Sequence, residues 1–522
     1  MVWVPSLRMP TLTTLRARQL LPILCIISAL SLVIFFTQSK FEYTVITSGT
    51  HDSNATDAIH NSTATDAIHD SNPTDANNDG FATDDTPPTP ETTSPNPVVK
   101  PKYKPQPTWT PPPVKDPFPL LSMGNPPPVP SWNIPKEPNV YHKYNLSVAP
   151  PLLVGFTRSW PMLLQTVVSY VTAGWPAEQI YVVENTGVHD ANAQGRLSLQ
   201  NPFYLNYTQL HMLGVRTIRT PVLLSFAQLQ NYFVTVAKDE SWPYFFWSHM
   251  DSFVLSYEEG MEGISGPVGT PEYQTIYELA IKELNHTIHS DDRWGARFFA
   301  YDHLALVNPY AYDDIGGFDT FIPYYMTDCD MHWRLEEAGW STKEAKAGIV
   351  EDVASVLDDL RVFYREDEGD VLEGLGFTDP NPPPPPPYVA RDNADEIEQR
   401  GNTQPSQGET MNTRGSAVVG SAQHATNVAS ALGSFKRLLQ ISHDMLKHKQ
   451  GDRGRNTWQL GQRGGDTREP HYYDALGFQV GIDVMTEAGR ETFRRKWGHQ
   501  GCDFGAAGLK PSDAWKVEKD WE

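Results

Sequence analysis

The chain has 522 residues, of which 39% are hydrophobic and 20% charged, so it is too rich in apolar side chains to be disordered throughout. Its 41 basic and 63 acidic residues give a net charge of −22, which excludes the basic surface typical of a nucleic-acid-binding protein. Three cysteines are too few for a disulfide framework.

An apolar run near the N-terminus predicts a membrane anchor. Residues 20–36, LLPILCIISALSLVIFF, are at the short end of the length that crosses a bilayer. Arg8, Arg16 and Arg18 precede the run. The positive-inside rule therefore predicts that residues 1–19 lie in the cytosol and that the chain after the run lies on the other side of the membrane. A cleaved signal peptide is the alternative, although no small-x-small cleavage site follows the run.

A polar, proline-rich segment follows the predicted anchor over residues 37–138. It contains three nine-residue units that begin at His51, His60 and His69. This composition predicts a disordered, extended stem that holds a folded domain away from the membrane. Acceptor motifs for N-glycosylation, each short enough to arise by chance, occur at Asn54, Asn61, Asn145, Asn206 and Asn285.

Alternating strand and helix signals predict an α/β domain over residues 139–376. Residues 151–160 have the pattern of a buried strand, and Pro161 suits the first turn of a helix that runs to Gly174. Residues 178–187 have the pattern of a second buried strand. Such a strand–helix–strand unit predicts a parallel sheet with helices on its faces.

The pattern continues with a helix over 225–239, a strand over 244–252, and a strand with a short helix or turn over 295–317. It breaks at residues 377–422, where a proline run and a Ser/Gly-rich stretch predict a disordered insertion. Residues 423–522 are predicted to form a C-terminal helix and segment that pack back on the domain.

The first candidate site is the sequence Ser-His-Met-Asp at residues 248–251, where a predicted strand ends. Ligands bind at the carboxyl ends of strands in open α/β sheets, and a carboxylate there can hold Mg²⁺ or Mn²⁺ against a diphosphate. In extended chain, His249 and Asp251 face the same side. The simpler interpretation is a strand end with a turn-forming aspartate.

The second candidate site lies in residues 316–340, GGFDTFIPYYMTDCDMHWRLEEAGW. Its glycine pair permits a tight turn, and Asp328 and Asp330 stand where a helix begins. Thr327 and Asp330 also fit a T-x-x-D capping box, which requires no catalytic function. That interpretation leaves Asp328 as the candidate general base.

These two motifs, in this order within an α/β unit, resemble those of a GT-A fold glycosyltransferase of the family-2-like kind. The resemblance covers about residues 150–365, with residues 430–505 as a further candidate part, and is to the type II Golgi membrane form found in fungi. It implies an α/β, Rossmann-like mixed sheet of the nucleotide-diphospho-sugar transferase kind, in a lumenal domain behind a single transmembrane helix and a stem.

The resemblance also implies a role for each matching residue. The family's strand-terminal Asp-x-Asp motif, which binds metal and nucleotide diphosphate, is His249-x-Asp251 here, and its substituted first position leaves metal dependence open. The implied donor-side residues are Gly155, Thr157, Arg158, Glu184, His249 and Asp251. The implied acceptor-side residues are Gly316, Gly317 and Asp319, and the implied catalytic base is Asp328 or Asp330.

Two features of the C-terminal segment bear on this site. The resemblance implies a further metal ligand from late in the chain, for which His499 is the candidate, with a surface or packing role as the alternative. Cys329 and Cys502 are the only cysteines outside the apolar run. In an oxidising compartment this pair suggests a disulfide, with two separate buried thiols as the alternative.

The resemblance therefore implies a glycosyltransferase, of the hexosyltransferase class, that acts in the Golgi lumen. Its donor would be a nucleotide-sugar, its cofactor Mn²⁺ or Mg²⁺, and its acceptor a glycan or glycoprotein. A catalytically inactive protein of the same fold, which binds glycans or a partner, is the alternative. A glycoside hydrolase would need two facing carboxylates, which the strand–helix layout does not place.

Overall fold

The computed structural model describes residues 100–103, 113–137, 139–365, 375–379, 419–453, 468–469 and 475–521. The chain divides into two compact units, Met1–Lys100 and Pro101–Glu522, and all the elements below belong to the second. The predicted anchor at residues 20–36 lies outside the described residues. Among the residues described, no helix is both long and apolar enough to span a bilayer.

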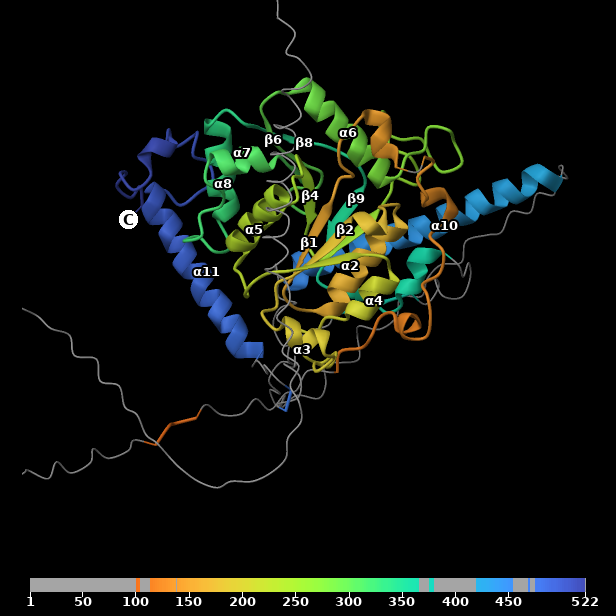
Figure 1. The fold of residues 1–522 in the computed structure, drawn as a ribbon, viewed down its shortest axis with the longest axis horizontal. Coiled ribbons are helices and arrows are strands. Elements are labelled where there is room, and N and C mark those ends of the chain that lie inside the picture. Colours follow the sequence, from red (N-terminus) through yellow and green to blue (C-terminus); the bar gives the residue numbers. More distant parts are fainter. Residues whose placement is uncertain are drawn as a thin grey trace, which may run out of the picture. The chain divides into compact units, whose positions relative to one another are not determined.

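The fold is α/β, with a mixed and mainly parallel sheet, as the sequence predicts (Figure 1). The strand order is β3-β2-β1-β4-β7-β6-β8. Strands β1 to β4 run parallel, and β7 runs antiparallel to both of its neighbours. The strands of this sheet are β1 (Leu152–Phe156), β2 (Ile180–Glu184), β3 (Arg216–Arg219), β4 (Phe245–Ser248), β6 (Trp294–Phe298), β7 (Leu304–Val307) and β8 (Ser341–Glu344).

Helices cover both faces of the sheet because its strands are apolar on both sides. In β1, Leu152, Val154 and Phe156 join the core under α2 and α6, whereas Leu153 joins the core under α5 and α8. The α-helices described are α2 (Trp160–Thr172), α3 (His189–Ala193), α4 (Tyr207–Met212), α5 (Phe226–Asp239), α6 (Ile276–Ser290), α7 (Pro309–Asp314), α8 (Thr327–Glu337), α10 (Val419–His448) and α11 (Ala475–Trp497).

Two short strand pairs accompany the main sheet. Strand β5 (Ser252–Leu255) directly follows Asp251 and pairs antiparallel with β9 (Ile349–Asp352). Strand β10 (Val356–Leu357) pairs with β11 (Phe377–Thr378). The 3-10 turns are Pro119–Ser122, Ser131–Asn133, Val140–Tyr144, Ala177–Gln179, Leu360–Tyr364 and Pro511–Asp513, and a π-helical turn at Lys449–Arg453 continues α10.

The expected strand–helix–strand unit is present as β1, α2 and β2, and the expected helix after Ser225 is α5, with Ser225 in a complete capping box. One strand was expected over residues 295–317, but two occur, β6 and β7, which form an antiparallel pair. The turn between them interrupts the apolar run with polar residues, and those residues enter the site described below.

Folded structure begins before the predicted boundary at residue 138, so the predicted stem is too long at its C-terminal end. Phe118 is fully buried, and the amide of Asn133 donates to the Thr172 carbonyl oxygen at 2.9 Å. The prediction failed because the proline-rich composition of this segment is typical of disordered chain, although these side chains are buried in the fold. The predicted insertion also begins too early, because Phe377–Thr378 is paired strand, and α10 begins at Val419 rather than near 423.

The predicted capping box at the start of α8 is wrong. Helix α8 has Met326 as its N-cap residue, with no side-chain capping bond. The Asp330 carboxylate instead accepts hydrogen bonds from Arg334 and from the indole of Trp497. Partners from the C-terminal helix α11 have therefore displaced the local bond that the sequence pattern suggests.

Candidate active site

A cavity of about 280 Å³ lies at the carboxyl ends of β1 and β4. Ligand sites of open α/β sheets occur at such strand ends. The cavity brings together both sequence motifs, because the turn after β4 and the first turn of α8 both line it. The predicted site residues among its lining are Gly155, Thr157, Arg158, His249, Asp251 and Asp328.

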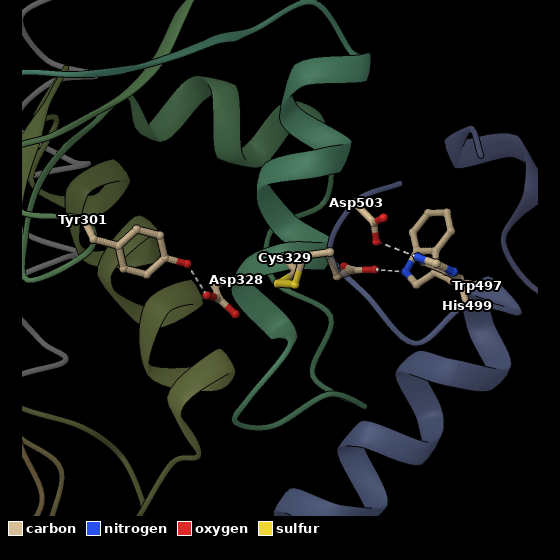
Figure 2. Close-up of a disulfide and its surroundings, with 8 residues drawn as sticks. Tyr301, Asp328, Cys329, Trp497, His499 and Asp503 are labelled. Carbon is tan, nitrogen blue, oxygen red and sulfur yellow. Dashed lines mark hydrogen bonds and ion pairs between the residues drawn. A yellow bond between two sulfur atoms is a disulfide. The ribbon is translucent and has the colours of Figure 1, made fainter. Parts of the chain in front are cut away.

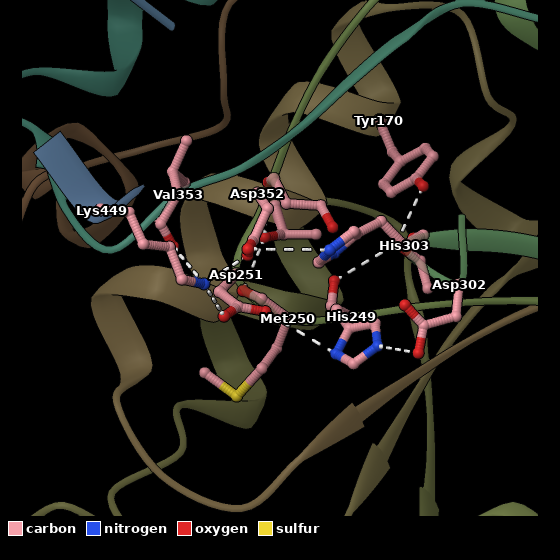
Figure 3. A network of polar contacts seen from close by, with 12 residues as sticks. Tyr170, His249, Met250, Asp251, Asp302, His303, Asp352, Val353 and Lys449 are labelled. Carbon is pink, nitrogen blue, oxygen red and sulfur yellow. Dashed lines mark hydrogen bonds and ion pairs between the residues drawn. The ribbon is translucent and has the colours of Figure 1, made fainter. Parts of the chain in front are cut away.

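A cluster of metal-ligating side chains forms one wall of this cavity (Figure 3). His249, Asp251 and His303 each offer an atom within 4.8 Å of the others. The His249 Nδ1 lies 3.9 Å from Asp251 Oδ1, and its Nε2 lies 3.4 Å from a carboxylate oxygen of Asp302. His303 comes from the turn between β6 and β7. Because β7 pairs with β4, this turn lies beside the end of β4.

The turn that carries Asp251 is fixed from several sides. Thr166 of α2 donates its hydroxyl to the carbonyl oxygens of Met250 and Ser252, at 2.6 and 2.8 Å. The Val353 amide donates to the Asp251 carbonyl oxygen at 2.9 Å. The Ser248 hydroxyl donates to the His303 carbonyl oxygen at 2.7 Å, which ties the two histidine-bearing turns together.

Electrostatics keep the aspartate charged and one imidazole neutral. Burial favours the neutral acid, but Lys449, His249 and His303 outweigh it and hold the pKa of Asp251 far below its ordinary value. Burial, together with the neighbouring His249, lowers the pKa of His303. Neutral imidazole is the form that binds metal ions.

The donor set fits a divalent cation. Within the described part of the chain, His303 Nδ1 is a buried ring nitrogen that makes no hydrogen bond. His249 Nε2 faces Asp302, and although burial lowers the pKa of His249, the charge of Asp302 outweighs this effect and raises it. Two imidazoles and a carboxylate suit Mn²⁺, which accepts both nitrogen and oxygen ligands. His249 can therefore take a ligand position that an aspartate would otherwise fill.

Asp328 also lines the cavity, where it is half-buried in the first turn of α8. The Tyr301 hydroxyl donates to its Oδ2 at 2.5 Å, as Figure 2 shows. Tyr301 and Met326 have φ values of +48° and +77°, in the left-handed region that non-glycine residues rarely adopt. Strained backbone of this kind is concentrated at functional sites.

Helix α11 contributes Phe478, Ile482 and Thr486 to the lining of the cavity. The buried Arg158 guanidinium donates to the Gln479 side chain at 2.9 Å and lies 4.7 Å from the centre of the Phe478 ring. Burial lowers the pKa of Arg158 to about 10, so the group stays charged at neutral pH. The Asn185 amide donates to the Thr157 hydroxyl at 3.2 Å, which joins the strand ends of β1 and β2.

Several predicted site residues do not reach the cavity. Glu184 is fully buried and accepts hydrogen bonds from Thr186, Asn192 and Tyr207. The Asp330 carboxylate is also fully buried, and Lys496 lies 2.6 Å from it. Both carboxylates therefore have structural partners in place of a ligand.

The glycine pair and Asp319 shape the turn before α8 and do not line the cavity. Gly316 and Gly317 have φ values of +79° and +69°. A Cβ on Gly317 would come within 2.4 Å of the Asn231 side chain, which bonds the backbone of Phe318. Asp319 lies 2.7 Å from the Lys496 ammonium.

The C-terminal segment is tied to α8 by a disulfide between Cys329 and Cys502 (Figure 2). His499 does not line the cavity, and Figure 2 shows it on the other side of this bond from Asp328. Its imidazole contacts the carboxylates of Asp503, at 2.8 Å, and Asp520. His499 is thus outside the metal-ligating cluster found among the described residues.

The predicted glycosylation sites differ in their surroundings. Asn145 is exposed, and Asn285 is half-buried on α6. Asn206 caps α4 by accepting from the Gln209 amide, and its own amide donates to the Tyr204 hydroxyl. Asn54 and Asn61 lie outside the described residues.

Sequence reasoning missed His303, Asp302, Asp352 and Lys449. The polar sequence Tyr-Asp-His at 301–303 interrupts an apolar run, which was the one available signal. Its nearness to Asp251 depends on β7 pairing with β4. Lys449 is 198 residues from Asp251 in sequence. It stands at the end of a predicted helix, and no motif around it indicates a site.

Comparisons with known proteins leave the family open. No protein-family model matches the chain, and neither does any curated protein. A mannosyltransferase from Pyrobaculum calidifontis, solved with GDP-Man and Mn²⁺, is 13% identical over 40% of this chain, with a TM-score of 0.25. A cytidylyltransferase from Leptospira borgpetersenii is 8% identical over 38% of this chain and 75% of its own, with a TM-score of 0.24.

The chain spans about three fifths of that mannosyltransferase, 61% of its length. At these TM-scores the likeness carries no argument about function. The functional conclusion therefore depends on the site itself.

Proposed function

We propose that this chain is a glycosyltransferase of the hexosyltransferase class, which transfers a sugar from a nucleotide-sugar donor to a glycan or glycoprotein acceptor. The observation that carries the proposal is convergence. Asp251 and Asp328, 77 residues apart in sequence, line one cavity at the strand ends of an α/β sheet, together with His249 and His303. A binding protein without turnover has no need of an acid–base group in the same cavity as a cation site.

The donor diphosphate would lie between Arg158 and the histidine–aspartate cluster. Arg158 offers a fixed, charged fork to phosphate oxygens, and its place is maintained by Gln479 and Phe478. A divalent cation held by His249, Asp251 and His303 would neutralise charge on the leaving diphosphate. The aromatic rings and leucine side chains that line the cavity would exclude water from the sugar.

Asp328 would accept the proton of the acceptor hydroxyl. A half-buried carboxylate that lines the cavity suits a general base. The Tyr301 hydroxyl holds Oδ2 of Asp328, so Oδ1 would face the acceptor. This arrangement belongs to an inverting reaction, in which one base activates the attacking hydroxyl.

The cellular setting is part of the same proposal. The apolar run at 20–36 would anchor the chain in the Golgi membrane, with the folded part in the lumen. The disulfide between Cys329 and Cys502 is consistent with an oxidising compartment.

The test uses the full chain and a panel of UDP- and GDP-sugars with Mn²⁺, with nucleotide release as the readout. We expect release with one donor class, and its loss in Asp251→Ala. The matched control is Asp313→Ala, since Asp313 is an exposed aspartate paired with Lys238 at the surface. Failure of the folded protein to bind any nucleotide-sugar would contradict the proposal. Binding without release, even with glycan acceptors added, would favour the non-catalytic alternative.

A further inference from the structure

Lys449 places a buried ammonium beside the candidate cation site. It is the first residue of the turn that continues α10, and it is 1% exposed. Its Nζ donates to Asp251 Oδ2 at 2.8 Å, to the Asp352 carboxylate, and to the Val353 carbonyl oxygen at 3.4 Å (Figure 3). Three acceptors match the three donor hydrogens of an ammonium group.

The ammonium lies behind the two carboxylates as seen from the cavity. Asp251 and Asp352 line the cavity, whereas Lys449 does not. A ligand in the cavity therefore meets the carboxylates first, and Lys449 acts on it only through them. Burial lowers the pKa of Lys449, but the two carboxylates outweigh this effect and raise it above its ordinary value. The group is thus charged over the whole physiological range.

The same Asp251 carboxylate belongs to the His249–Asp251–His303 cluster. Its two oxygens face different neighbours, because Oδ2 contacts Lys449 and Oδ1 faces His249 Nδ1 at 3.9 Å. A divalent cation bound by the cluster would therefore share the Asp251 carboxylate with the Lys449 ammonium. Like charges that share a buried carboxylate oppose one another.

We propose that Lys449 is a positioning residue that competes with the divalent cation for Asp251, and so sets the metal affinity of this site. The ammonium holds Asp251 and Asp352 in place without metal, and its charge keeps the affinity for metal low. Removal of the charge leaves two neighbouring carboxylates without their shared ammonium partner, and these attract a divalent cation more strongly. The inference depends on the cation cluster and is independent of the transferase activity.

The experiment measures Mn²⁺ binding by the full chain, from the electron paramagnetic resonance signal of free Mn²⁺. The test variant is Lys449→Met, which keeps an unbranched side chain shorter by one atom and removes its charge. We expect it to bind Mn²⁺ at least about tenfold more tightly than the unaltered chain. Lys447→Met, at an exposed position two residues earlier, is the matched control and should leave the affinity unchanged.

Three further variants separate a change of affinity from a change of fold. Lys449→Arg retains the charge, so it should bind Mn²⁺ as weakly as the unaltered chain. Asp251→Asn, added to Lys449→Met, should abolish the gain. Lys449→Gln keeps a hydrogen-bond donor for the carboxylates, and it replaces Lys449→Met if that variant does not fold.

Thermal unfolding gives an independent readout. Without Mn²⁺, Lys449→Met should melt below the unaltered chain, and saturating Mn²⁺ should raise its midpoint by more than it raises that of the unaltered chain. Equal or weaker Mn²⁺ binding in both uncharged variants would overturn the inference. Tighter Mn²⁺ binding without any nucleotide-sugar binding would support the inference while contradicting the proposed function.

Discussion

Asp328 and Asp330 lie two residues apart in sequence, but we expect mutation of one to affect turnover and mutation of the other to affect stability. Asp330 is fully buried and contacts the Trp497 indole at 3.0 Å, the Lys496 ammonium at 2.6 Å and the Arg334 guanidinium at 2.9 Å. Asp328 is half-buried and faces the cavity. We therefore expect Asp330→Ala to reduce stability and Asp328→Asn to reduce turnover.

The size of the first effect follows from the contacts. Removing one partner from a buried ion pair costs about 3–5 kcal/mol, because the remaining charge stays buried. Lys496 retains Asp319 as a second partner, at 2.7 Å, so the lower end of this range applies. At about 2 °C per kcal/mol for a chain of this size, Asp330→Ala should lower the melting midpoint by roughly 6 °C.

The assay compares the two variants by calorimetry and by nucleotide release from the donor. Asp328→Asn should melt within about 1 °C of the unaltered chain and lose at least about 100-fold in turnover, as expected for loss of a general base. Asp313→Ala, which removes an exposed carboxylate paired with Lys238, is the control for both readouts. An unchanged melting midpoint in Asp330→Ala, or full turnover in Asp328→Asn, would refute the reasoning.

The remaining predictions concern the base, the cation cluster and the C-terminal anchor. Tyr301→Phe removes the hydroxyl that holds Asp328, so turnover should fall about tenfold with no change in melting. His303→Ala should weaken Mn²⁺ binding at least about tenfold, measured by the free Mn²⁺ signal, and unchanged binding would exclude this ligand. The pKa of His499 is raised by hydrogen bonds from its ring to two carboxylates. Its stabilising effect is therefore complete below a pH of about 6.5 and is lost as the pH rises through the raised value. Melting of His499→Gln should accordingly differ from that of the unaltered chain in acid and converge with it in alkali.

The local elements of the sheet could be predicted from the sequence because their signals are local. The apolar run of β1, Pro161 in the first turn of α2 and the Ser225 capping box each act within a few residues. Position at a strand end made His249 and Asp251 candidates, the resemblance assigned them a role, and both line the cavity.

The wrong or missing parts depend on distant partners. The T-x-x-D pattern at 327–330 predicts a cap, but Asp330 bonds Trp497, 167 residues away, because a buried indole and ammonium compete for the same carboxylate. Glu184 ends β2 as expected, yet its carboxylate turns towards Asn192 and Tyr207 rather than the cavity. A side chain's direction at a strand end depends on the helices packed around it.

Periodicity and strand-end position depend on neighbouring residues alone, so they were sufficient to predict an α/β chain with two acidic motifs at the ends of predicted elements. Which charges meet depends instead on how distant segments pack. The antiparallel pairing of β7 with β4 brings His303 to Asp251, and the end of α10 brings Lys449 to the same carboxylate. Burial makes these pairings strong, and burial is a property of the packed molecule rather than of any segment.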